Sequence, residues 1–223
     1  EKIVLEIKDR LQKRYQMDLD HIKIIEELDK KTTVTHKDIY SSVMQSLNNG
    51  QEIWGEKTLL EWTNIPLFLS YFPQGKVIHI IRDPRGVTAS YKHMTIEPNN
   101  RYLDSAFCCL SSLQFAESYS RILSTKSYLI VKYEDLISDK EHETKKICDF
   151  LGIEFSDRML NSDYHIDMLG NVLTKERHSS FPGSKRKVEW PNVLSSDEIN
   201  FVEHVCGRSM LSFGYTPFDN LDN

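Results

Sequence analysis

The sequence contains few cysteines and lacks the patterns that mark disulfide-rich or metal-binding proteins. Four cysteines occur among 223 residues, and two of them, Cys108 and Cys109, are neighbours that rarely pair with each other. No metal-ligand spacing and no Asn-x-Ser/Thr glycosylation acceptor is found. We therefore expect the cysteines to be small core residues and predict no bound metal. The missing acceptors and disulfide pattern favour a cytoplasmic protein.

Long apolar runs and an excess of positive charge are also lacking. No run of roughly 18 apolar residues occurs, so we predict no membrane segment. The formal net charge of −5 argues against a nucleic-acid partner, although it permits a local cationic pocket for one anionic ligand. A Walker-type loop, Gly-x-x-x-x-Gly-Lys-Ser/Thr, is absent. The length and the 39% hydrophobic content suit one domain over residues 1–223.

Helical and strand-like patterns alternate along the chain. Val77–Ile81 and Ser127–Val131 are short apolar runs, typical of strands buried on both faces of a parallel sheet. Helical spacing is found at residues 1–16, 20–30, 37–48, 62–72, 102–124, 139–151 and 195–211. The sequence therefore predicts an α/β fold, a parallel sheet flanked by helices. No capping residue precedes the first helix, so we expect residue 1 to lie inside a helix.

Individual residues mark the expected ends of several helices. Thr35 is suited to begin one helix, and Ser195 with Glu198 forms the pattern of a capping box at the last one. Pro66 stands early in its helix, where proline is tolerated. Gly152 stands where a glycine would end a helix.

The first predicted strand leads directly into a turn with two arginines. Arg82-Asp83-Pro84-Arg85 follows the strand, and Ser90 lies in the helix after it. Ligands of open α/β sheets bind at the carboxyl ends of strands, so Arg82 and Ser90 could converge on an anion. The planar guanidinium group suits phosphate oxygens. The alternative is an Arg–Asp pair that only staples the turn.

Three segments resemble one known family. Residues 73–90 (PQGKVIHIIRDPRGVTAS) are similar to the 3′-phosphate-binding segment of the sulfotransferase superfamily, whose donor is 3′-phosphoadenosine 5′-phosphosulfate (PAPS). Residues 129–136 (LIVKYEDL) and 184–190 (SKRKVEW) resemble two further blocks of these enzymes. The resemblance covers roughly residues 52–216. It implies the P-loop NTPase-like sulfotransferase fold.

The resemblance also implies which residues bind the donor. Arg82 and Ser90 would hold the 3′-phosphate, and Tyr133 would lie near the adenosine. Lys185 and Arg186 would reach the phosphates of the nucleotide. From the residues alone, the basic run could equally be a solvated loop, and Tyr133 could be an ordinary residue at a strand end.

A candidate for acid–base chemistry precedes these segments. Residues 54–58 (WGEKT) resemble a Glu-Lys-Ser/Thr stretch of some carbohydrate sulfotransferases. By that resemblance Glu56 is the general base and Lys57 an electrostatic helper. The alternative is a surface Glu-Lys pair, and His93 is a second candidate base. His79 alternates within the predicted strand, and we expect it to be a packed core residue.

The function implied by the resemblance is transfer of a sulfonate group from PAPS to a hydroxyl of a carbohydrate or small-molecule acceptor. The product would be 3′-phosphoadenosine 5′-phosphate (PAP), and no metal is required. The Ser-Gly-Thr loop with which the family holds the phosphosulfate does not occur in these residues, and we expect it upstream of Glu1. Two alternatives are a P-loop kinase and a non-catalytic nucleotide-binding protein of the same fold. Because carbohydrate-modifying relatives can be luminal, the Golgi lumen is the alternative location.

Overall fold

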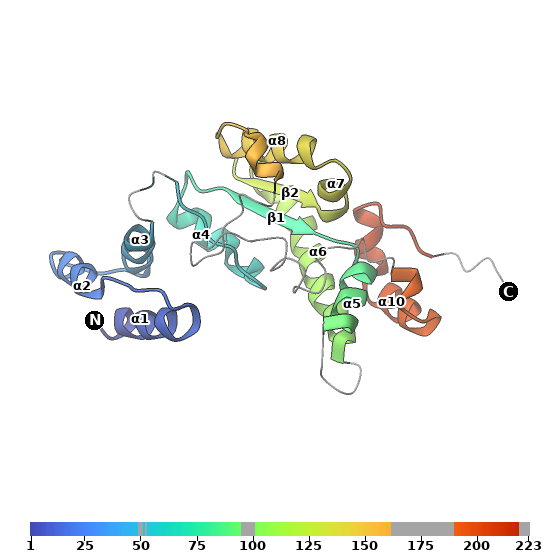
Figure 1. The fold of residues 1–223 in the computed structure, drawn as a ribbon, viewed down its shortest axis with the longest axis horizontal. Coiled ribbons are helices and arrows are strands. Elements are labelled where there is room, and N and C mark those ends of the chain that lie inside the picture. The colour runs from blue at the N-terminus through green and yellow to red at the C-terminus, as the bar shows by residue number, and fades with distance from the viewer. Residues whose placement is uncertain (49–50, 52, 95–100, 162–189, 219–223) are drawn as a thin grey trace. The chain divides into compact units, whose positions relative to one another are not determined.

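The computed structural model describes residues 1–48, 51, 53–94, 101–161 and 190–218 (Figure 1). The chain divides into two compact units. The described residues of the first are those of Glu1–Leu59, and the second holds the described residues from Leu60 onward. The expectation of one domain over the whole chain stays a prediction.

The first unit is built from amphipathic helices. Its helices are α1 (Lys2–Tyr15), α2 (His21–Asp29) and α3 (His36–Leu47), each within two residues of the predicted bounds. Thr35 caps α3 and forms a capping box with Asp38, which confirms the N-cap predicted at Thr35. The apolar faces of the unit meet in one cluster, formed by Val4, Leu19, Ile24, Leu28 and Val43.

The second unit contains the predicted parallel strands. β1 (Val77–Ile81) and β2 (Tyr128–Lys132) pair in parallel, and Ile81 lies opposite Lys132. This confirms the α/β class. Because the strands are parallel and in register, the turn after β1 and the start of the segment after β2 lie at the same edge of the sheet.

Helices surround this strand pair in the second unit. In the view of Figure 1, α7 and α8 lie on one side of the strands, and α5, α6 and α10 lie on the other. None of the described helices is long and apolar enough to cross a membrane. The elements of the unit besides the strands are η1 (Trp62–Asn64), α4 (Ile65–Tyr71), α5 (Pro84–Met94), η2 (Arg101–Asp104), α6 (Ser105–Ile122), α7 (Tyr133–Ser138), α8 (Lys140–Leu151), η3 (Asp157–Leu160), η5 (Trp190–Asn192) and α10 (Ser196–Ser212).

The core of the second unit lies between β1, α6 and α10. Ile81 from β1 packs in one cluster with Leu113 of α6 and Met210 of α10. His79 is buried beside this core, and its ring nitrogens lie 2.6 Å from the Tyr128 hydroxyl and 2.9 Å from Ser112 Oγ. Burial lowers the pKa of His79 to about 4, so the ring is neutral at pH 7. The expectation of a packed core histidine is confirmed.

Local signals located the helix ends of this unit well. Pro66 lies in the first turn of α4, and Gly152 ends α8 in the left-handed conformation, with a φ of 76°. The capping box of Ser195 and Glu198 is formed at the start of α10. The short helix α7, directly after β2, was not predicted, because its six residues are too few to show a helical period.

Two expectations about burial were wrong. Ile80 of β1 is 54% exposed, so the strand is not buried on both faces. Side chains of a strand alternate between the two faces, and the core described above covers the face of His79 and Ile81. Cys109, Cys148 and Cys206 are buried as expected, but Cys108 is exposed, and all four are free thiols.

Candidate anion-binding site

Arg82 is the first residue after β1, at the carboxyl edge of the sheet. Its guanidinium carbon lies 4.3 Å from the centroid of the Tyr133 ring, and Tyr133 is the first residue of α7. Parallel pairing of β1 and β2 causes this meeting, because it places the residues after the two strands side by side. Among the described residues, no carboxylate forms an ion pair with Arg82. No described carboxylate therefore neutralises its positive charge.

Ser90 lies on the face of α5 that is directed toward Arg82. Its hydroxyl donates a hydrogen bond of 2.9 Å to the carbonyl oxygen of Gly86, one helical turn earlier. A Cβ atom built on Gly86 would lie 3.5 Å from Arg82 Nε, so Gly86 faces that guanidinium group. Residues four apart lie on one face of a helix, which places Ser90 beyond Gly86 on the Arg82 side. The structure thus brings the two predicted residues to one face of α5.

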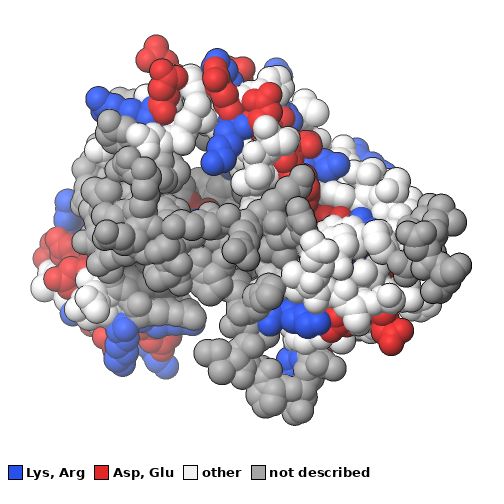
Figure 2. All heavy atoms as spheres, turned by 45° about the vertical axis from the view of Figure 1, so that its right-hand side comes forward, with Lys and Arg blue, Asp and Glu red and all other residues white. Residues whose placement is uncertain are grey.

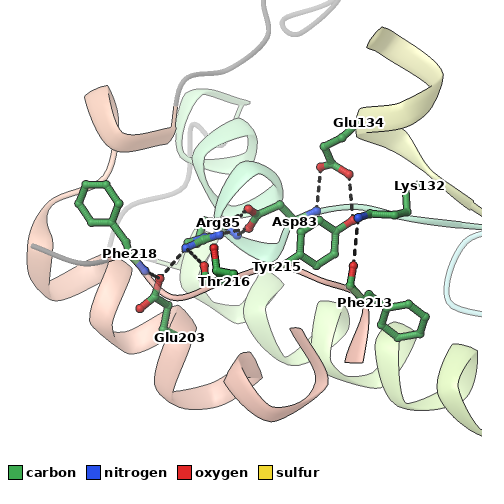
Figure 3. A network of polar contacts seen from close by, with 9 residues as sticks. All are labelled: Asp83, Arg85, Lys132, Glu134, Glu203, Phe213, Tyr215, Thr216 and Phe218. Carbon is green, nitrogen blue, oxygen red and sulfur yellow. Dashed lines mark hydrogen bonds and ion pairs between the residues drawn. The ribbon is translucent and has the colours of Figure 1, made fainter. Parts of the chain in front are cut away.

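Arg85, the second arginine of the turn, has a different environment from Arg82. It is buried, and its guanidinium group pairs with Asp83 at 2.8 Å and with Glu203 of α10 at 2.6 Å (Figure 3). It also donates to the carbonyl oxygen of Thr216 and lies over the Trp190 ring. The alternative of an Arg–Asp pair that staples the turn is therefore realised by Arg85, whereas Arg82 is left for other contacts.

Glu134 joins the turn to the carboxyl-terminal segment. One of its carboxylate oxygens accepts the backbone N–H of Asp83 at 2.9 Å, and the other accepts the Tyr215 hydroxyl at 2.8 Å. Lys132, at the end of β2, lies over the Tyr215 ring and donates to the carbonyl oxygen of Phe213. Sequence reasoning gave Glu134 no role. The available signal was its place just after the second parallel strand, beside the turn that carries Arg82.

Glu56 and Lys57 belong to the first unit, and both are exposed. The Tyr40 hydroxyl donates a hydrogen bond of 2.6 Å to Glu56 Oε2, and the Tyr40 ring meets Trp54 edge to face. Burial, together with the Glu56 carboxylate, raises the pKa of Tyr40, so its hydroxyl stays protonated and acts as the donor. Tyr40 is a partner that the sequence did not indicate, and it holds one oxygen of Glu56 in place.

Three further predicted residues are not described at the side-chain level. His93 lies in α5, but its side chain falls outside the described part of the structure. Lys185 and Arg186 lie in residues 162–189, which are outside the described residues as well. Their roles stay predictions.

Charged side chains of both signs occur on the described surface. On the face shown in Figure 2, acidic and basic side chains are interspersed over the described residues. In the described part of the chain, no three His, Cys, Asp or Glu residues gather as metal ligands would. The feature that favours anion binding is Arg82 at the end of β1, which forms no ion pair with a carboxylate among the described residues.

A parallel strand pair, with this arginine at the end of one strand and a helix directly after it, defines an α/β protein with a candidate anion site at its strand ends. A family model described as the sulfotransferase family matches residues 4–157. The chain belongs to the sulfotransferase family. This confirms the resemblance seen in the sequence.

Named relatives agree with this membership. Mouse carbohydrate sulfotransferase 1 is 28% identical over 160 residues, which are 63% of this chain and 38% of that protein. Mouse carbohydrate sulfotransferase 4 is 21% identical over 160 residues, which are 62% of this chain and 41% of that protein. The match thus spans less than half the length of each of these relatives.

Solved structures show the same fold. The sulfotransferase domain from the curacin biosynthetic pathway aligns with a TM-score of 0.61 at 15% identity, over 93% of this chain and 78% of that one. The sulfotransferase domain from the Synechococcus PCC 7002 olefin synthase aligns with a TM-score of 0.52 at 20% identity, over 88% and 79%. The predicted sulfotransferase fold is confirmed.

Proposed function

We propose that this chain takes part in transfer of a sulfonate group from PAPS to a hydroxyl of a carbohydrate, with PAP as the product. Membership of the sulfotransferase family supports the reaction type. The names of the relatives support a carbohydrate acceptor. The observation that carries the proposal is Arg82, a cation at the carboxyl end of β1 with no described carboxylate partner.

The residues at this edge fit a phosphate group. The N–H donors of Arg82 lie in the plane of its guanidinium group, and no described carboxylate pairs with them, so they can bind phosphate oxygens. The Ser90 hydroxyl can add a donor if it turns from the Gly86 carbonyl. We assign both residues to the 3′-phosphate of the donor. The adenosine contact of Tyr133 and the phosphate contacts of Lys185 and Arg186 are predictions carried by the family resemblance.

The acceptor hydroxyl must lose a proton when it attacks sulfur. The donor supplies an activated sulfonate group, and the protein supplies the base and the charge. We assign the base to Glu56, whose carboxylate is exposed and oriented by Tyr40, and a stabilising charge to Lys57. His93 is the next candidate for the base. The location stays a prediction, with the cytoplasm as the first expectation and the Golgi lumen as the alternative.

Calorimetry with PAP tests the phosphate assignment. Arg82→Ala should weaken PAP binding by about 2–3 kcal/mol, the scale of a charge-assisted hydrogen bond. Arg121→Ala is the matched control, because Arg121 is exposed on α6 and pairs only locally with Glu117 among the described residues. ATP with Mg²⁺ is titrated in parallel, since a kinase would prefer it. Equal PAP affinity in wild type and Arg82→Ala would refute the assignment.

A further inference from the structure

The Arg82 side chain is held by a neighbouring aromatic ring. Its guanidinium carbon lies 4.3 Å from the centroid of the Tyr133 ring, and Arg82 is half-buried. A guanidinium group over an aromatic face is attracted to it, and the contact neutralises none of its charge. The same guanidinium group lies against the backbone of α5 at Gly86, where an added Cβ would be 3.5 Å from Nε and 3.7 Å from a terminal nitrogen. These contacts restrict the side chain while leaving its charge available.

The backbone beside Arg82 is held by the residue after Tyr133. Glu134 accepts the N–H of Asp83, which belongs to the peptide bond that follows Arg82. The second oxygen of Glu134 accepts the Tyr215 hydroxyl, so the carboxylate is fixed from two directions (Figure 3). Two consecutive residues of α7 therefore hold Arg82, one at its side chain and one at its main chain.

We propose that Tyr133 and Glu134 are positioning residues for Arg82, and that their contacts orient its guanidinium edge toward the 3′-phosphate of the nucleotide. This inference rests on the proposed function. It assigns the Tyr133 ring a role besides the adenosine contact that the family resemblance implies. A side chain held in advance loses less conformational entropy when the phosphate binds, so the contacts should raise affinity for that phosphate alone.

Two nucleotides that differ only in the 3′-phosphate distinguish the positioning role of Tyr133 from an adenosine contact. PAP and adenosine 5′-phosphate are titrated into the whole protein, with the variants Tyr133→Leu, Tyr133→Phe and Arg82→Ala and the double variant of Arg82→Ala with Tyr133→Leu. Tyr133→Leu should lower the preference for PAP over adenosine 5′-phosphate about three- to tenfold. Tyr133→Phe keeps the ring and should keep the wild-type preference. In the Arg82→Ala background, Tyr133→Leu should not lower this preference further.

Glu134 is tested through its partner Tyr215, so that the half-buried carboxylate itself is not removed. Tyr215→Phe loses only the hydroxyl, and we expect a loss of PAP affinity of about two- to fivefold, without an effect on adenosine 5′-phosphate. Thermal unfolding of each variant shows whether it is folded at the temperature of the titration.

The outcomes that overturn the inference differ from those that overturn the proposed function. Equal weakening of both nucleotides by Tyr133→Leu would assign the ring to the adenosine that they share. A loss of this preference in the double variant equal to the sum of the single losses would show that Tyr133 does not act through Arg82. An unchanged preference for PAP in Arg82→Ala would instead overturn the assignment of Arg82 itself.

Discussion

Arg85 and Glu203 form an ion pair of 2.6 Å that joins the start of α5 to α10. The side chain of Arg85 is 5% exposed and that of Glu203 is 16% exposed, so water screens the pair little. Asp83 forms a second ion pair with the guanidinium group of Arg85. The turn that presents Arg82 is thus tied to a helix that lies far away in the sequence.

Removing the buried arginine should destabilise the fold. Arg85→Met leaves two carboxylates without their cation, and we expect the free energy of unfolding to fall by about 3 kcal/mol. Urea unfolding followed by circular dichroism measures it. The control is Arg121→Met, whose pair with Glu117 has an arginine side chain 71% exposed, and it should cost less than about 1 kcal/mol. Similar losses in the two variants would contradict the structural role of Arg85.

Glu198 should make the fold sensitive to acid. Burial by itself would raise its pKa, but hydrogen bonds from Lys92, the Tyr102 hydroxyl and the Ser195 N–H lower the pKa to about 2, from 4.5. A carboxyl group whose pKa is lowered in the folded state stabilises that state above its unfolded pKa. This stabilisation should be lost as the pH falls from 4.5 to about 2.

The variant Glu198→Gln isolates this contribution. It should be less stable than wild type at pH 7, and its stability should change less between pH 4.5 and 2. Urea unfolding at several pH values gives both curves. Glu141→Gln is the control, because Glu141 pairs with Lys145 on the exposed surface of α8. A curve for Glu198→Gln parallel to that of wild type would contradict the prediction.

Gly152 should be needed for its backbone conformation and not for space. Its φ is 76°, and an added Cβ would meet only Lys76 Nζ, at 3.9 Å. We expect Gly152→Ala to destabilise by about 1 kcal/mol, because side chains disfavour this left-handed region. Gly207→Ala, inside α10 and with no described atom within 4 Å of the added Cβ, should instead stabilise by up to about 1 kcal/mol. Thermal unfolding compares the two, and a stabilising Gly152→Ala would contradict this account.

Glu56 should matter for turnover and not for the nucleotide. If it is the base, Glu56→Gln lowers kcat about 100-fold or more while PAP affinity stays nearly unchanged. A sulfonate-transfer assay on a carbohydrate acceptor and calorimetry with PAP measure the two quantities. Glu61→Gln is the control, since Glu61 is an exposed carboxylate whose described side-chain partner is Asn64. Retained turnover in Glu56→Gln would move the role of base to His93.

Local patterns in the sequence by themselves determined the bounds of β1, the parallel sheet, most helix bounds and the resemblance to the family. The bounds of β1 follow from a run of five residues that is apolar except for His79, and the helix caps follow from residues within three positions of each end. Such features depend on neighbours along the chain, so they can be read without the fold. Arg82 and Ser90 were identified in the same way, from a short motif between a strand and a helix.

Tertiary structure alone decided which arginine of the turn is paired. Arg85 meets Glu203, 118 positions later, and the Asp83 N–H meets Glu134, 51 positions later. Arg82 and Arg85 flank the same Asp-Pro pair, so the residues of the turn alone do not show which arginine is buried and paired. Only the parallel pairing of β1 with β2 brings Tyr133 beneath Arg82, and only the packing of α10 encloses Arg85. The exposure of Ile80 has the same origin, since burial depends on which elements cover each face of a strand.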